Sequence, residues 1–251
     1  MTPEDTEPCM ESSQTILNSH NGDNILVLMA KAPRPGTVKT RLARSLPVEA
    51  VTELYRCLLA DTIALAHSLC GVTVAIMCPA SDVEELALLA GGETGVVAQQ
   101  GDGLAAALIS VFAHFAVPGS RHVIAFNCDS PHLPAAVLAN AFEMLNVHDV
   151  VIGPTHDGGY YLVGAKAVHA ELFLRDGMGT DSALDALLAC ARRLQLSVGF
   201  TDPFYDIDVE GDLTRLAAEL RLAPARAPRT AAWVEEWQQS VPRLRSAAGE
   251  L

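Results

Sequence analysis

The chain has 251 residues, of which 30 are acidic and 17 are basic, so its formal net charge is −13. Half of the residues are hydrophobic and 19% are charged, which is typical of a globular protein and excludes a disordered one. The acidic balance argues against nucleic acid or an anionic membrane as a partner, because both require a basic surface. A small anion could still bind where basic residues gather.

The N-terminal segment 1–23 contains five acidic residues and no basic residue, and we expect it to be a flexible acidic tail. It lacks the basic start and apolar core of a signal peptide, and no apolar run in the chain reaches the roughly 18 residues of a membrane span. The six cysteines show no C-x-x-C spacing and are expected to be buried thiols. These features predict a cytoplasmic protein.

From residue 24 onward, predicted strands and helices alternate. Continuous apolar runs predict buried strands at Ile25–Ala30, Val72–Cys78, Val96–Gln99, His122–Asn127 and Val150–Gly153. Helical spacing predicts helices at Val48–Leu69, Ser81–Leu89, Gly103–Phe115 and Pro134–Leu145. This alternation is typical of βαβ units, in which a mainly parallel sheet lies between two layers of helices.

After Gly153 the pattern changes. A turn is followed by a predicted antiparallel strand at Tyr160–Gly164, a helix at Thr180–Leu194, a strand at Leu196–Phe200 and a helix near Gly211–Leu220. We therefore predict one three-layer α/β domain over residues 24–222, with a mainly parallel sheet and antiparallel additions. Residues 223–251 are expected to form a linker and a final helix, docked on the domain through Trp233 and Trp237.

Basic residues gather in segment 31–44, directly after the first predicted strand, where five of the 17 lie. Ligands of open α/β sheets bind beyond the carboxyl ends of strands, where a helix start offers N–H groups to an anion. Lys39 and Arg41 at the predicted helix start oppose the helix dipole, and a bound phosphate would remove that conflict. We expect both to act on phosphate; a solvated basic loop is the alternative.

Two glycine-containing segments are similar to nucleotide-binding motifs. The segment around Gly36 lacks the second glycine of a P-loop. Gly101-Asp102-Gly103 resembles a dinucleotide fingerprint, but it does not follow the first strand, and no acidic residue lies about 20 positions further on. Backbone groups along residues 30–36 and 99–103 are nevertheless expected to hold a nucleotide; the residues concerned are Ala30, Lys31, Pro33, Gly36, Gly101, Asp102 and Gly103.

Acidic residues mark a candidate metal site. Asp129 follows the fourth predicted strand, where a carboxylate is well placed for Mg²⁺, although it could simply cap a turn. Asp206 and Asp208 are two residues apart and are expected to point the same way, so that a cation would relieve their repulsion; capping of a helix is the alternative for Asp208 and for Asp212. His132 is expected to be a surface turn residue.

A glycine-containing turn, GPTHDGGYY at 153–161, is the last candidate. Adjacent glycines allow a close approach of the backbone to a ligand, and Asp157 could accept a hydrogen bond from a hydroxyl group; a plain hairpin is the alternative. Asp157, Gly158 and Gly159 are accordingly expected to face an acceptor.

Four segments taken together resemble a bacterial family of transferases, DUF2064: KAPRPGTVKTRLA at 31–43, CDSPHL at 128–133, GPTHDGGYYL at 153–162 and DIDVEGDL at 206–213. The resemblance spans about residues 25–220. It implies the nucleotide-diphospho-sugar transferase superfamily and a GT-A-like, Rossmann-like fold. It also implies that Lys39 and Arg41 contact phosphate and that Asp129 and Asp208 hold Mg²⁺ or Mn²⁺. His132 replaces an acid of the family pattern, and Gly101–Ala106 lacks a charged pair.

Two reactions fit this resemblance. The first is transfer of a nucleotidyl group from a nucleoside triphosphate to a small phosphate, phosphonate or carboxylate acceptor, with release of pyrophosphate. The second is glycosyl transfer from a nucleotide sugar. We favour nucleotidylyl transfer because Lys39 and Arg41, with Lys31 or Arg34, supply the positive charge that a triphosphate needs. A non-enzymatic nucleotide sensor is the third hypothesis, and the sequence leaves open whether the chain forms a homodimer.

Overall fold

The computed structural model describes residues 23–116, 122–174 and 182–248. The expected acidic tail lies almost entirely outside these residues, as does the start of the helix expected at Thr180–Leu194. Among the helices in the described ranges, none is both long enough and apolar enough to cross a membrane.

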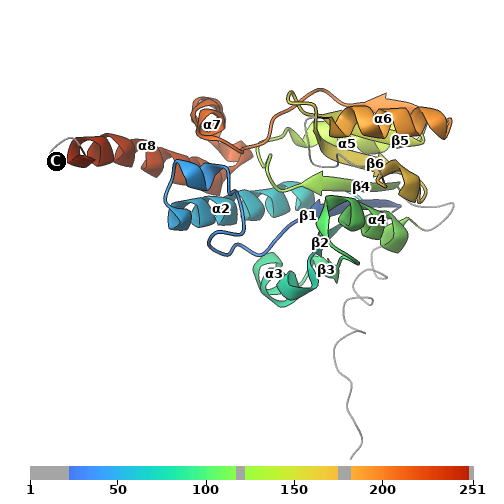
Figure 1. Ribbon diagram of the computed structural model, residues 1–251, viewed down its shortest axis with the longest axis horizontal. Coiled ribbons are helices and arrows are strands. Elements are labelled where there is room, and N and C mark those ends of the chain that lie inside the picture. Colours follow the sequence, from blue (N-terminus) through green and yellow to red (C-terminus); the bar gives the residue numbers. More distant parts are fainter. Residues whose placement is uncertain (1–22, 117–121, 175–181, 249–251) are drawn as a thin grey trace, which may run out of the picture.

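A seven-stranded sheet forms the centre of the molecule (Figure 1). Its strand order is β3-β2-β1-β4-β6-β5-β7. The strands are β1 (Asn24–Met29), β2 (Val72–Cys78), β3 (Gly95–Ala98), β4 (His122–Asn127), β5 (Val150–Pro154), β6 (Tyr160–Ala165) and β7 (Val198–Phe200). Within the described residues β6 alone runs antiparallel to its neighbours β4 and β5, which confirms the mainly parallel α/β sheet with an antiparallel addition.

Helices cover both faces of this sheet. One face packs against α2 (Val48–His67), α3 (Val83–Ala90) and α5 (Ala135–Leu145), and the other packs against α4 (Gly103–Phe115) and α6 (Ala183–Arg193). Alternate residues of β1 supply the two cores: Leu26 and Leu28 face the first, and Ile25 and Val27 face the second. A strand buried on both faces must be apolar at every position, which is why its continuous apolar run predicts it.

The last two helices extend the structure beside α2 (Figure 1). Helix α7 (Glu210–Leu222) and helix α8 (Pro228–Ala248) share a third apolar core with the N-terminal half of α2. The buried carboxylate of Asp61 on α2 accepts hydrogen bonds from the backbone N–H groups of Arg229 (3.3 Å) and Thr230 (2.8 Å), at the start of α8. Trp233 and Trp237 pack against this core with their rings stacked 6.3 Å apart.

The strand order reverses between β1 and β4. The chain moves outward from β1 to β2 and β3 and then returns to β4 on the other side of β1. Loops that leave the carboxyl ends of β1 and β4 therefore diverge, and such a switch point leaves a crevice for a ligand. The basic segment follows β1 and Asp129 follows β4, so the fold brings both to this crevice.

Candidate functional site

Two cavities meet at the carboxyl ends of β1 and β4. The larger, about 830 Å³, extends over the loop after β1, the end of β2 and the turn before α4. The smaller, about 280 Å³, extends under β6 and the turn that precedes it. Both are lined by Met29, Arg41, Leu104, Asp129 and Asp208. The basic and acidic residues of the predicted site thus lie at the junction of the two cavities.

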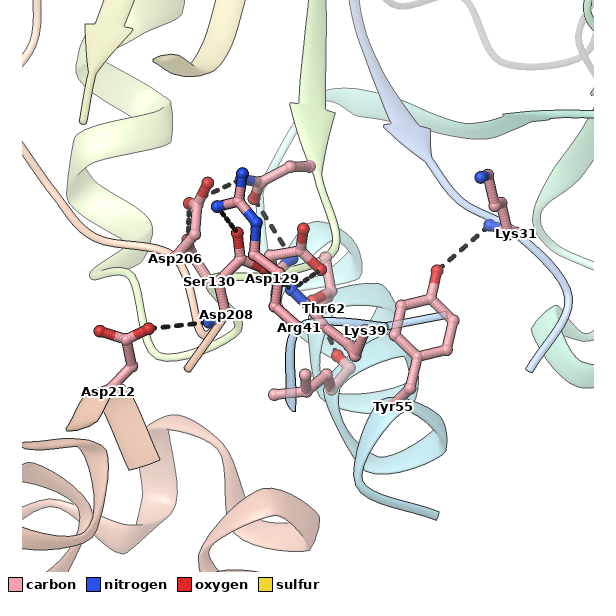
Figure 2. A network of polar contacts seen from close by, with 12 residues as sticks. Lys31, Lys39, Arg41, Tyr55, Thr62, Asp129, Ser130, Asp206, Asp208 and Asp212 are labelled. Atoms are coloured by element: carbon pink, nitrogen blue, oxygen red, sulfur yellow. Dashed lines mark hydrogen bonds and ion pairs between the residues drawn. The ribbon is translucent and has the colours of Figure 1, made fainter. Parts of the chain in front are cut away.

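Lys39 lines the larger cavity and contacts two acids, Asp129 and Asp208, that line both cavities (Figure 2). Its Nζ lies 2.6 Å from Oδ1 of Asp129 and 2.9 Å from Oδ1 of Asp208, and its side chain is only 4% exposed. Burial alone would lower the pKa of this ammonium group, but the two carboxylates outweigh burial and raise it. Lys39 is therefore a buried, charged side chain that is fully compensated by the two acids.

The backbone around Lys39 differs from the expected helix start. Lys39 has a φ of +48°, in the left-handed region, and only a short 3₁₀ helix follows at Leu42–Arg44. Regular helix begins at Val48, after Pro47. The expectation that Lys39 and Arg41 oppose a helix dipole is therefore wrong, because no α-helix begins there. The left-handed turn directs Lys39 into the crevice instead.

The two acids paired with Lys39 come from distant segments. Asp129 follows β4, and its carbonyl oxygen accepts a hydrogen bond from the N–H of Ile207 at 3.1 Å, which joins the two segments. The Asp212 carboxylate accepts the N–H groups of Asp208 (2.9 Å) and Val209 (2.8 Å) at the start of α7. Asp212 therefore caps the helix, whereas Asp208 directs its carboxylate into the site.

Asp206 has different partners from Asp208, although both line the smaller cavity. Its Oδ1 accepts hydrogen bonds from Nδ2 of Asn127 (2.8 Å) and Oγ of Ser130 (2.9 Å). Burial and the nearby charge of Asp129 raise the pKa of Asp206 to about 6, against the opposing effect of Lys39. The expectation that Asp206 and Asp208 share one cation is therefore not met by their contacts, because Asn127 and Ser130 bind Asp206 whereas Lys39 binds Asp208.

Arg41 and Arg34 have unlike environments. The Arg41 side chain is 56% exposed, lies 3.5 Å from Oδ2 of Asp208 and lines both cavities. Arg34 instead points away from the site, because its guanidinium pairs with Asp82 (2.8 Å) and Glu85 (3.0 Å). The alternative in which Arg34 assists Lys39 on phosphate is therefore not supported by its position.

Five of the seven expected nucleotide-binding residues line the larger cavity: Ala30, Lys31, Gly101, Asp102 and Gly103. Pro33 and Gly36 line neither cavity: Pro33 is buried, and Gly36 is exposed with a φ of +77°. The loop is held by Tyr55, which sequence reasoning missed: its hydroxyl accepts the N–H of Lys31 at 3.1 Å and lines the cavity.

The expected acceptor residues lie at the smaller cavity. Asp157 and Gly159 line it, whereas Gly158, with a φ of +88°, does not. Oδ1 of Asp157 accepts hydrogen bonds from Oγ1 of Thr155 (2.5 Å) and from the N–H of Gly159 (3.3 Å). The Thr155 hydroxyl in particular lowers the pKa of Asp157, so this carboxylate is ionised near neutral pH.

His132 is buried, which contradicts the expectation of a surface turn residue. Its side chain is 1% exposed and packs against Phe204 and Tyr205, with ring centroids 4.8 Å away in each case. Burial, with a smaller contribution from Arg215, lowers its pKa to about 3, so the imidazole is neutral. His132 lies behind the segment that carries Asp206 and Asp208 and lines neither cavity.

The donor set at the junction fits a hard divalent cation. No three His, Cys, Asp or Glu side chains in the described ranges converge as a ready-made metal site. Oxygen atoms of Asp129 and Asp208 nevertheless approach the same positive group, the Lys39 ammonium. Mg²⁺ and Mn²⁺ prefer oxygen ligands, and Mg²⁺ is usually held by one or two carboxylates together with substrate phosphates and water. Two acids therefore suffice for such a site.

Residues 62–180 match the family DUF2064, described as an uncharacterized protein conserved in bacteria. The matched family is the one that the sequence motifs resemble, and the fold is shared with a solved structure described as a nucleotide-diphospho-sugar transferase. The matched segment includes Asp129 and Asp157, while Lys39, Arg41 and Asp208 lie outside it. A comparison with curated protein sequences gave no match.

Three solved structures show the same fold. A "putative nucleotide-diphospho-sugar transferase" from Desulfovibrio desulfuricans G20 is 25% identical, with a TM-score of 0.80 over 88% of this chain and 98% of the other. A nucleotidyl transferase from Methanothermobacter thermautotrophicus is 20% identical (TM-score 0.56; 80% and 100% covered). Rv0371c from Mycobacterium tuberculosis, in complex with manganese, is 18% identical (TM-score 0.51; 78% and 97% covered).

Proposed function

We propose that this protein is a metal-dependent nucleotidyltransferase, which transfers a nucleoside monophosphate from a triphosphate to a small acceptor and releases pyrophosphate. One observation carries the proposal: Lys39, Asp129 and Asp208 meet where a large and a small cavity join. A cavity of about 830 Å³ suits a nucleotide, and one of about 280 Å³ suits a small acceptor. The reacting phosphorus would lie at the junction.

The roles of the basic residues follow from their positions. Lys39 and Arg41 would contact the phosphates, with Lys31 at the far side of the larger cavity. Their positive charges would stabilise the negative charge that develops on the departing pyrophosphate. Asp129 and Asp208 would hold Mg²⁺ or Mn²⁺, which supplies further positive charge to the phosphate oxygens. The loop held by Tyr55 and the turn at 101–103 would bind the base and ribose.

The charge of the smaller cavity bears on the acceptor. Among the residues that the structure describes, the carboxylates of Asp129, Asp157, Asp206 and Asp208 line it, together with one guanidinium, that of Arg41. Even when a divalent cation compensates Asp129 and Asp208, the two remaining carboxylates outnumber Arg41. This balance favours an uncharged, hydroxyl-bearing acceptor, for which Asp157 offers a hydrogen-bond acceptor, over the anionic acceptor expected from the sequence.

Glycosyl transfer is the second candidate, because the Desulfovibrio structure, with the TM-score of 0.80, is described as a transferase of nucleotide-diphospho-sugars. One experiment separates the two reactions. The protein is incubated with Mn²⁺ and each nucleoside triphosphate or nucleotide sugar, together with paired acceptors such as glycerol and glycerol phosphate. Pyrophosphate release supports nucleotidylyl transfer. Release of a nucleoside diphosphate from a nucleotide sugar, dependent on the acceptor, identifies glycosyl transfer. If no combination of donor and acceptor yields either product, both proposals are contradicted.

A further inference from the structure

The Lys39 ammonium lies where a cation shared by Asp129 and Asp208 would bind. The Oδ1 atoms of the two acids are 2.6 and 2.9 Å from Nζ. Mg²⁺ binds oxygen at about 2.0–2.1 Å, so a metal ion on the same two oxygen atoms would lie within van der Waals distance of Nζ. Two positive groups in contact repel strongly in a partly buried site. Lys39 in this position and a divalent cation on these oxygen atoms therefore exclude each other.

The ammonium cannot leave this place without a replacement. Its side chain is 4% exposed, whereas the side chains of Asp129 and Asp208 are 30% and 38% exposed. The buried ammonium needs carboxylates or another anion, because an unpaired buried charge is costly. The two acids in turn need a cation, because they belong to segments that the fold holds close together. The two carboxylates and the Lys39 ammonium therefore stabilise one another.

The larger cavity offers Lys39 a second position. Lys39, Lys31 and Arg41 all line it, so phosphate groups bound there would provide an anionic partner within reach of Nζ. When the ammonium turns to phosphate, the two carboxylates lose their cation. A divalent ion that arrives with the phosphates would then restore the charge balance at Asp129 and Asp208.

We propose that Lys39 excludes free divalent cations from Asp129 and Asp208, so that the site accepts the metal only together with nucleotide phosphates. This proposal rests on the proposed function for the identity of the anion. Lys39 would then have two roles. It contacts phosphate, and it ensures that the substrate binds as the metal–nucleotide complex.

The test measures Mn²⁺ binding to the nucleotide-free protein by electron paramagnetic resonance, in which free Mn²⁺ is distinguished from bound Mn²⁺. Lys39→Met removes the ammonium and keeps the apolar stem of the side chain. Lys31→Met is the matched control, because Lys31 lines the same cavity and makes no ion pair with Asp129 or Asp208 in the structure as described. We expect Lys39→Met to bind Mn²⁺ at least about tenfold more tightly than the wild type and Lys31→Met.

Equal Mn²⁺ affinity of the wild type and both variants would overturn the proposal. If Lys39→Met does not fold without metal, Mn²⁺ should restore its thermal unfolding transition, because the ion replaces the missing charge. The same is expected of Lys39→Gln. If Mn²⁺ restores the transition of neither variant, the proposal is also contradicted. The assay contains no substrate and measures no turnover. A protein that shows no transferase activity but gains Mn²⁺ affinity on loss of Lys39 would refute the proposed function and leave this inference intact.

Discussion

The Asp82 carboxylate accepts a hydrogen bond from the backbone N–H of Ala32 at 2.9 Å and thereby ties the start of α3 to the loop after β1. The same side chain pairs with the guanidinium of Arg34 and is 8% exposed. Although burial acts to raise the pKa of Asp82, these donors lower it below its usual range. One buried acid thus fixes the loop that carries the basic residues to the larger cavity.

Replacement of this acid should loosen the loop. We expect Asp82→Ala to lower the free energy of unfolding by about 1–3 kcal/mol, because the Ala32 N–H is left buried without a partner. The measurement is urea unfolding monitored by circular dichroism. Glu84→Ala, at an exposed position in the first turn of α3, should change stability by less than about 0.5 kcal/mol. Equal effects of both substitutions would show that Asp82 does not anchor the loop.

Arg41 should matter for turnover and not for folding. Its guanidinium is exposed, and its contact with Asp208 is long, at 3.5 Å, so that this contact contributes little to stability. We expect Arg41→Ala to reduce kcat/KM about 100-fold or more, with a melting temperature within about 2 °C of the wild type. Arg44→Ala is the control, because Arg44 is exposed three residues away and lines neither cavity. Full activity of Arg41→Ala would exclude a role for Arg41 in catalysis.

His132 should make the protein less stable in acid. Its pKa is about 3 in the folded state and about 6.5 in an unfolded chain, so the unfolded state takes up the proton first as pH falls. The stability that neutral His132 contributes is present above pH 6.5 and is lost as pH falls towards 3, by up to about 1.4 kcal/mol per pH unit.

The contribution of His132 is isolated by comparing variants, since Asp206 also titrates in this range. Between pH 7 and pH 5, the free energy of unfolding should fall less steeply for His132→Leu than for the wild type. His156→Leu, at an exposed position, should follow the wild type. Parallel curves for all three proteins would mean that His132 is protonated without penalty in the folded state.

Gly153 should tolerate no side chain. A Cβ added there would collide with Cζ of Tyr161 and lie 2.8 Å from Cγ of Leu162. Tyr161 cannot move freely, because its hydroxyl lies 2.6 Å from Oγ1 of Thr201. We expect Gly153→Ala to cost about 1–3 kcal/mol in thermal or urea unfolding. Gly211→Ala, in α7 with no atom within 4 Å of the added Cβ, should instead be neutral or stabilise by up to about 1 kcal/mol.

The strands were predictable because they lie in the middle of the molecule. β2 and β4 have the predicted bounds. Their residues are buried on both faces of the sheet, and a continuous apolar run is typical of such strands. The helices α4 and α5 were predicted equally closely from their apolar spacing. These features depend on local sequence and on a fold class with strict handedness rules.

The site was less predictable because its contacts are not local. His132 is buried by aromatic residues more than 70 positions further along the chain, which its own neighbours in the sequence do not reveal. The turn at Lys39 depends on a left-handed backbone conformation that lysine rarely adopts. Asp206 and Asp208 are two residues apart, but Asn127 and Ser130 bind one and Lys39 binds the other. Only the folded chain separates their roles.

Lys39 and Asp208 lie 169 positions apart in the sequence, and this separation determines when the site is completed during synthesis. All seven strands precede Asp206, so a growing chain can contain the whole sheet while Lys39 has only Asp129 as a partner. The second acid arrives with the segment before α7, which must emerge from the ribosome and pack beside α2. The pair of acids around Lys39 is therefore completed only after most of the domain has been translated.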